Sequence, residues 1–241
     1  MSFCLFILFF ISSFTFPLFA HETQLSALES KVYAQSDKLE IIENFYSAAK
    51  EKSNSISDEV KRLVFLSRCD ELLGRYHIFL GDLTAAREVF RQGIANAEKA
   101  LSIKETADAQ EALVMNISQN MRCENTAYML KHGLRLQGMI KKIYELNKDS
   151  QWAKYFEITQ NVYAPKGFGN AKKGKQSVNE LLSDEKNLSA GLRFNAWTAK
   201  AKAHILLKEW DEANNALAMA EKIFPKNAEV ASLKTELRQH K

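Results

Sequence analysis

The chain has 241 residues, a length that fits one large domain or two small ones. It carries 33 basic and 29 acidic residues, so its net charge is only +4, and the two signs alternate along the chain. A nucleic-acid-binding surface would show clustered basic residues with interleaved aromatics, so we expect no nucleic-acid partner. Prolines number only three, and none occurs between Pro17 and Pro165, which favours an all-helical protein.

Residues 1–20, MSFCLFILFFISSFTFPLFA, form an uncharged apolar run that ends abruptly at a polar sequence. The run is nearly long enough to span a bilayer, but serines, a threonine and a proline interrupt it, and Ala20 offers a small residue for cleavage. We predict a signal peptide over 1–20, a periplasmic or otherwise exported protein, and a helical domain over 21–241. Because the usual positive start is missing, an uncleaved N-terminal anchor is the alternative.

Two amphipathic helices are expected between residues 22 and 50, with Ser36 or Asp37 capping the second. Their apolar stripes are Leu25, Leu28 and Val32, then Leu39, Ile42, Phe45 and Ala49. A polar loop, EKSNSIS, follows them. A longer helix is predicted from about residue 57 to Leu80.

Residues 67–100 have the pattern of a helical hairpin. Gly81 can adopt the left-handed conformation that ends a helix, and Asp82 or Thr84 can accept the free amide hydrogens of the next one. The apolar and small side chains expected between the two helices are Leu73, Gly74, Ala86, Phe90 and Gly93. No proline closes this unit, so its second helix can continue towards Leu101.

Two cysteines remain if residues 1–20 are removed, Cys69 and Cys123. In an oxidising compartment they could form a disulfide between the third helix and a later one. Alternatively, each is a small half-buried residue on a helix. The histidines are scattered and neither cysteine has a nearby partner, so we expect no metal site.

Residues 105–147 predict two helices with a break at 119–125, and a further helix with four aromatics spans Trp152 to Tyr163 and ends before Pro165. Methionine and leucine at helical spacing are typical of a packed core. The core candidates in the first two helices are Leu113, Met115, Ile117, Met129, Leu130, Leu134, Leu136, Ile140 and Ile143.

Residues 169–176, GNAKKGKQ, nearly match the phosphate-binding loop GxxxxGK[ST]. However, Gln176 cannot supply the hydroxyl that ligates magnesium, and no buried strand precedes the first glycine. We therefore interpret Gly169 and Asn170 as a turn before a helix, with Gly174 at a position that requires a small residue. We expect no nucleotide and no other cofactor.

The stretch 194–227 predicts the clearest hairpin, with two amphipathic helices joined at KEWD and ended by Pro225. Small residues at fixed spacing would let the two helix axes approach closely. The residues that define this pattern are Trp197, Ala201, Ala213, Leu217 and Ala220. A last helix over 229–240, capped by Asn227, places Val230, Leu233 and Leu237 on one face and would close the stack.

This hairpin pattern resembles the tetratricopeptide (TPR) repeat, whose period is 34 residues. The sequence departs from it at Lys200, His204 and Lys208, where Leu, Tyr and Gly are usual in that family. The resemblance implies an all-α fold of antiparallel helical hairpins, a TPR-like α-solenoid. Because the spacing between the two hairpins is not a multiple of that period, irregular insertions are expected in the middle.

The same resemblance implies a concave groove lined by the first helix of each hairpin. The groove residues would be Asn195, Thr198 and Lys202, and in the earlier hairpin Arg68, Glu71 and Arg75. Polar residues of this kind suit the end of a peptide or an anionic ligand. Alternatively, these side chains only face solvent.

Over about residues 60–225, the exported irregular array, with GDLTAAREVFRQGIANAEKAL in its first half, also resembles the T-component family of tripartite ATP-independent periplasmic (TRAP) transporters. Those TPR-like proteins associate with a solute-binding protein. We therefore expect a non-catalytic scaffold of the bacterial cell envelope, an accessory of a solute transporter whose partner is a periplasmic solute-binding protein. A small-ligand-binding protein, a membrane-tethered spacer and a hydrolase with an unrecognised site are the alternatives.

Overall fold

The computed structural model describes residues 16–164 and 167–240, which contain helices and no strand. Most of the predicted signal peptide lies outside these residues. The helices are α1 (Phe16–Ala34), α2 (Leu39–Ser53), α3 (Glu59–Leu80), α4 (Leu83–Ile103), α5 (Ala107–Asn120), α6 (Thr126–Leu146), α7 (Gln151–Val162), α8 (Ala171–Leu182), α9 (Ala190–Leu206), α10 (Trp210–Ile223) and α11 (Ala228–His240), with short 3-10 helices η1 (Met121–Cys123) and η2 (Glu185–Asn187). None of the described helices is both long and apolar enough to cross a bilayer.

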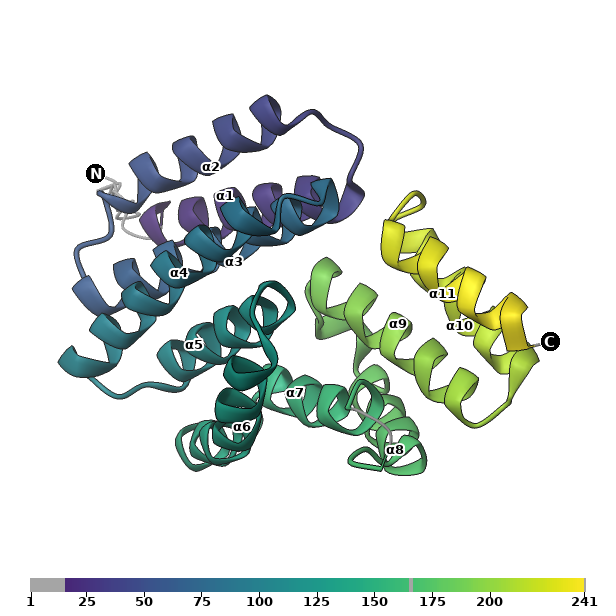
Figure 1. Ribbon diagram of the computed structural model, residues 1–241. Coiled ribbons are helices and arrows are strands. Elements are labelled where there is room, and N and C mark those ends of the chain that lie inside the picture. The colour runs from purple at the N-terminus through teal and green to yellow at the C-terminus, as the bar shows by residue number, and fades with distance from the viewer. Residues whose placement is uncertain (1–15, 165–166, 241) are drawn as a thin grey trace, which may run out of the picture.

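Successive helices pair into hairpins that follow an arc (Figure 1). In this view α1 to α4 lie at the upper left, α5 to α8 at the bottom, and α9 to α11 on the right. The odd-numbered helices form the inner layer, because α1 packs on α3, α3 on α5, and α7 on α9. Helix α1 also contacts α9, so the two ends of the arc meet. The predicted all-α fold of helical hairpins is confirmed.

The hairpin α3–α4 forms as its sequence predicts. Gly81 ends α3 with φ of 80°, and the Asp82 side chain accepts a hydrogen bond from the Ala85 amide at 3.0 Å. Gly74 packs directly on the fully buried ring of Phe90, because a Cβ atom added to this glycine would lie 2.7 Å from Phe90 Cδ1. The absence of Cβ therefore sets the distance between the two helix axes.

The hairpin α9–α10 is also packed through small residues. Ala201, Ala213 and Ala220 have no exposed surface, and Trp197 is half-buried, with its indole N–H donating to Glu185 Oε1 at 3.0 Å. Pro225 is exposed at the turn between α10 and α11. At the position of the usual turn glycine, Lys208 has φ of 62°. The backbone at this position thus has the left-handed conformation that glycine adopts most easily, although the residue is a lysine.

Replacing Lys208 by glycine is expected to raise the free energy of unfolding by about 0.5–1 kcal/mol, because glycine adopts positive φ without steric cost. Gly81→Ala, at the corresponding turn of α3–α4, is the matched control and should lower it by about 1 kcal/mol. Urea unfolding followed by circular dichroism measures both. A destabilised K208G would show that the lysine side chain holds the turn.

Helix α6 departs from the predicted core. Three of its core candidates are exposed, Met129 at 39%, Leu130 at 67% and Leu134 at 81%. In α6 only residues from Leu136 onward are buried, against α5 and α7. The first half of the helix extends past its neighbours, so apolar residues there have nothing to pack on, and their assignment to the core was wrong.

The predicted cap of α11 is present, and Asn170, predicted only as part of a turn, also caps a helix. Asn170 accepts a hydrogen bond from the Lys173 amide at the start of α8, and Asn227 accepts one from the Glu229 amide at the start of α11. Helix α2, in contrast, begins after Lys38 with no side-chain cap, so the prediction of Ser36 or Asp37 was wrong. The carbonyl of Asp37 instead accepts a hydrogen bond from the Tyr76 hydroxyl, which ties this loop to α3.

Candidate functional site

Charged residues of α3 lie on the inside of the arc. Glu71 and Arg75, one helical turn apart, form an ion pair in which the side chains are 5% and 15% exposed. The Arg75 guanidinium also lies over the Tyr33 ring of α1, 5.5 Å from its centroid. Burial alone would lower the pKa of Arg75, but the Glu71 carboxylate outweighs it and the pKa is raised. This pair is fixed between helices and is not a free charge.

Helix α1 covers this part of α3 and joins it to α9. The Asn195 side-chain amide donates to the Tyr33 hydroxyl oxygen at 2.7 Å. The Gly191 amide donates to Glu29 Oε2 at 3.2 Å, and the Ser189 hydroxyl donates to Glu29 Oε1 at 3.4 Å. These contacts join residues at opposite ends of the chain, so they hold the arc closed.

Arg68, one turn before Glu71, lies between aromatic and acidic neighbours. Its guanidinium is 5.2 Å from the centroid of the Trp152 ring, and its Nε is buried with no hydrogen-bond partner. Its positive charge opposes the burial that raises the pKa of Glu29 and of Glu111. Glu111 itself accepts a hydrogen bond from Ser150 at 2.6 Å. Arg68 is therefore held in place while one of its donors stays unused.

Helix α7 and the residue that follows it place aromatic side chains near these charged residues. Burial raises the pKa of Tyr155, and the charge of Glu229 on α11 raises it further. Tyr163 follows α7, is 41% exposed, and donates to Glu229 Oε1 at 3.3 Å. Sequence reasoning noted these aromatics but gave them no role. We define the inner site as Arg68, Glu71, Arg75, Trp152, Tyr155 and Tyr163.

The residues predicted to line the groove divide into two sets. Arg68, Glu71 and Arg75 belong to the inner site. Asn195 and Thr198 are buried, at 1% and 0% exposure, and both form hydrogen bonds within the protein. Lys202 is half-buried and binds Glu236 of α11 at 2.5 Å. The groove face of α9 is thus occupied by α1 and α11.

No protein-family model and no curated protein matches the sequence. Among solved structures, a similar chain is YrrB, described as a TPR protein with an unusual peptide-binding site. The two chains are 13% identical, the alignment covers 86% of this chain and 88% of that one, and the TM-score is 0.38. A similarity this low supports no conclusion about the ligand of this chain.

Some carboxyl groups in the arc have shifted pKa values. A substitution of Glu29 tests how such a shift affects the stability of the fold. Burial raises its pKa above the usual 4.5, although Arg68 and the Gly191 amide oppose the shift. A carboxyl group whose pKa is higher in the folded state than in the unfolded state stabilises the fold at pH values below its unfolded-state pKa. This contribution is lost as the pH rises through the folded-state pKa. Glu29→Gln should therefore raise the Tm at about pH 8 and leave it unchanged at about pH 4.

Thermal unfolding followed by circular dichroism across pH measures this difference. Glu43→Gln, at an exposed position of α2, is the control and should leave the Tm unchanged at every pH. A constant difference between E29Q and the wild type across pH would show that the glutamate acts through its shape and not through its charge.

The segment that resembles a phosphate-binding loop is part of a helix. Residues from Ala171 onward form α8, and Gly174 packs against Val162 of α7. Lys175 donates to both carboxylate oxygens of Glu209, at 2.7 and 3.0 Å, and this bond is the main cause of the lowered pKa of Glu209. The lysine therefore ties α8 to the α9–α10 turn.

Of the two alternatives for Cys69 and Cys123, a disulfide or two unpaired residues on helices, the structure has the second, with both thiols free. Cys69 lies in the core formed by the ends of the chain, whereas Cys123 packs with Ala86 and Phe90 under α4. Burial raises the pKa of Cys69 to about 12, so this thiol is protonated at neutral pH. Within the described residues, no group of three or more potential ligands could hold a metal ion.

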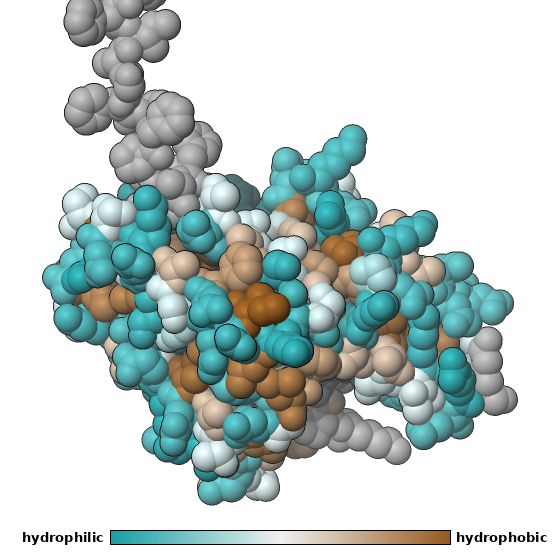
Figure 2. Space-filling view, turned by 90° about the horizontal axis from the view of Figure 1, so that it is seen from above, coloured by the Kyte–Doolittle hydropathy of each residue, from teal (hydrophilic) through white to brown (hydrophobic). Residues whose placement is uncertain are grey.

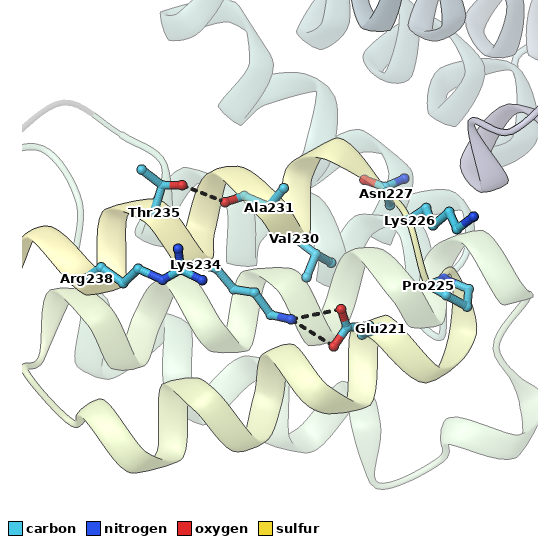
Figure 3. A pocket seen from close by; sticks show the side chains of 9 residues that line it. All are labelled: Glu221, Pro225, Lys226, Asn227, Val230, Ala231, Lys234, Thr235 and Arg238. Atoms are coloured by element: carbon cyan, nitrogen blue, oxygen red, sulfur yellow. Dashed lines mark hydrogen bonds and ion pairs between the residues drawn. The ribbon is translucent and has the colours of Figure 1, made fainter.

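An open pocket of about 330 Å³ lies away from the inner site, between α10 and α11 (Figure 3). Lys234 reaches across it to both carboxylate oxygens of Glu221, at 2.8 Å. Lys226 and Arg238 also line this pocket, and none of the inner-site residues does. Pro225 is the one predicted repeat residue in its lining.

Proposed function

We propose that the chain is a non-catalytic binding protein that holds a segment of a partner protein at the inner site. The observation that carries this proposal is Arg68, whose buried Nε lacks a hydrogen-bond partner while Trp152 fixes its guanidinium. A buried donor without a partner costs free energy, and because Arg68 as a whole is partly exposed, an acceptor on a ligand would bind its guanidinium and offset this cost. The site is formed before binding, so little ordering is needed.

The charges around Arg68 favour a neutral acceptor over an anion. Glu29 and Glu111 both interact electrostatically with it, and Glu71 is already paired with Arg75. A free anion would be repelled by these carboxylates, whereas a peptide carbonyl would not. The aromatic residues Tyr155 and Tyr163 would pack on the side chains of such a peptide. A peptide segment therefore fits better than the small anionic ligand that the sequence also allowed.

Arg68→Met tests this function, because methionine keeps the contact with Trp152 and removes the donors. Affinity capture from an envelope fraction, quantified by mass spectrometry, should recover a partner with the wild type and about tenfold less with R68M. Arg62→Met, on the same helix but 37% exposed, is the control and should capture as the wild type does. Equal recovery with all three proteins would exclude the inner site.

The resemblance to the TRAP T-component family makes a periplasmic solute-binding protein the first partner to test. A mature N-terminus at His21, measured by mass spectrometry of the exported protein, would support the periplasmic location. A retained 1–20 segment would instead support a membrane-tethered protein.

A further inference from the structure

The three most exposed large hydrophobic side chains in the described part of the chain are Phe168 at 85%, Leu134 at 81% and Leu130 at 67%. Leu130 and Leu134 are on α6, and Phe168 is in the turn that precedes α8. Helices α6 and α8 both lie at the lower edge of the arc in Figure 1. Exposed apolar residues that gather on one side of a protein mark an interaction surface.

Exposed basic residues accompany these apolar ones. Helix α6 has no acidic residue from Thr126 to Tyr144, and Lys131 and Arg135 are each adjacent in sequence to an exposed leucine. Lys172 and Lys173, in the first turn of α8, are exposed near Phe168. We call the exposed residues Leu130, Lys131, Leu134, Arg135, Phe168, Lys172 and Lys173 the lower face. Its charge is positive although the whole chain is nearly neutral.

The surface in Figure 2, which is viewed from above, differs from the lower face in how its hydrophobic and hydrophilic residues are distributed. There hydrophilic residues cover most of the rim, and hydrophobic residues gather towards the middle. On α6 the exposed leucines instead point away from the buried stripe of Leu136, Met139, Ile140 and Ile143. They stand out from the surface on a helix whose first half has no buried residue.

We propose that the lower face binds the surface of an anionic lipid bilayer. Leucine and phenylalanine side chains that project among lysines and arginines are typical of segments that enter the interfacial region while the cations bind lipid phosphates. A second copy of this chain fits poorly, because it would place Lys131 and Arg135 against their own counterparts. The lower face comes from two separate elements, α6 and the residues at the start of α8. A flat bilayer surface would contact both more readily than a single helix of a partner protein would.

Tryptophan reporters test where the protein meets the bilayer. Phe168→Trp and Leu134→Trp should shift to blue emission and be quenched by brominated lipids in vesicles that contain phosphatidylglycerol. Leu80→Trp, on α3 in the upper half of Figure 1 and itself 47% exposed, should do neither. All three variants share residues 1–20 and the three native tryptophans, so the comparison isolates the lower face.

Charge variants test the anionic component. Each basic residue near an anionic bilayer contributes about a fivefold factor to binding. With F168W as the reporter, the double change Lys131→Gln and Arg135→Gln should raise the lipid concentration for half-maximal quenching about 25-fold. Lys38→Gln with Lys61→Gln, which removes two exposed charges elsewhere, should change it little. Added salt should weaken the quenching of F168W that carries no further substitution.

Three outcomes would overturn the proposal. The lower-face reporters could ignore anionic vesicles, L80W could be quenched as strongly as F168W, or phosphatidylcholine vesicles alone could give the same signal. Binding of F168W to an acidic polypeptide such as polyglutamate without binding to vesicles would assign the lower face to an acidic protein partner instead.

Discussion

Replacing Arg75 by methionine is expected to lower the free energy of unfolding by about 3–5 kcal/mol, because a buried carboxylate would lose its partner. Glu71 is 5% exposed, so water cannot replace the guanidinium. The contact of Arg75 with the Tyr33 ring is lost as well, which loosens α3 from α1. Urea unfolding followed by circular dichroism measures the change.

The double variant Glu71→Leu with Arg75→Met separates charge from packing. Both groups become apolar at similar volume, so most of the lost stability should return. Arg62→Met removes an arginine from an exposed pair with Glu59 on the same helix, and should change stability by less than about 1 kcal/mol. If E71L/R75M were as unstable as R75M alone, the loss would come from packing and not from an unpaired charge.

Replacing Gly93 by alanine should lower the free energy of unfolding by about 2–4 kcal/mol, through overpacking and a broken polar junction. A Cβ atom at this position would lie 2.6 Å from Asn116 Cγ. The Asn116 amide donates to Ser67 and to the Ala112 carbonyl, each at 3.0 Å, and the Ser67 hydroxyl donates to the Gly93 carbonyl at 2.8 Å. The junction joins α3, α4 and α5, so its loss affects three helices.

Gly133 provides the matched control, since it is also within a helix but has open space where a Cβ atom would be. Gly133→Ala should raise stability by about 0.5–1 kcal/mol through helix propensity alone. Thermal and urea unfolding measure both variants. Equal stabilisation by G93A and G133A would mean that α4 and α5 are farther apart than the structure places them.

Local chemistry allowed most of the helices to be predicted from the sequence. Gly81 and Asp82 mark a turn through their own backbone and side-chain preferences, and small residues such as Gly74 and Ala213 mark close helix contacts. The periodic pattern gave wrong predictions where contacts between distant helices determine whether a side chain is buried. Leu134 has the spacing of a core residue, but a periodic pattern does not show whether a neighbouring helix reaches that far.

The candidate site shows the same limit. The resemblance to TPR units placed Arg68 and Asn195 on the inner helices, as the structure does. It could not show that Tyr33 and Glu29 of α1 would contact α9, because that contact joins residues far apart in the chain. The burial of Asn195 follows from this contact, so the sequence could indicate a polar surface but not which of its residues remain available.

The contact between α1 and α9 also changes how the chain can acquire its structure. In an open array of repeats, each unit needs only its neighbour and can fold as soon as it leaves the ribosome. Here Glu29 and Tyr33 must wait for Gly191 and Asn195, which are synthesised much later. Long-range closure of this kind slows folding and links early residues to late ones. Removing or duplicating an internal hairpin would therefore misalign both ends, and evolution of this chain by gain or loss of units is constrained accordingly.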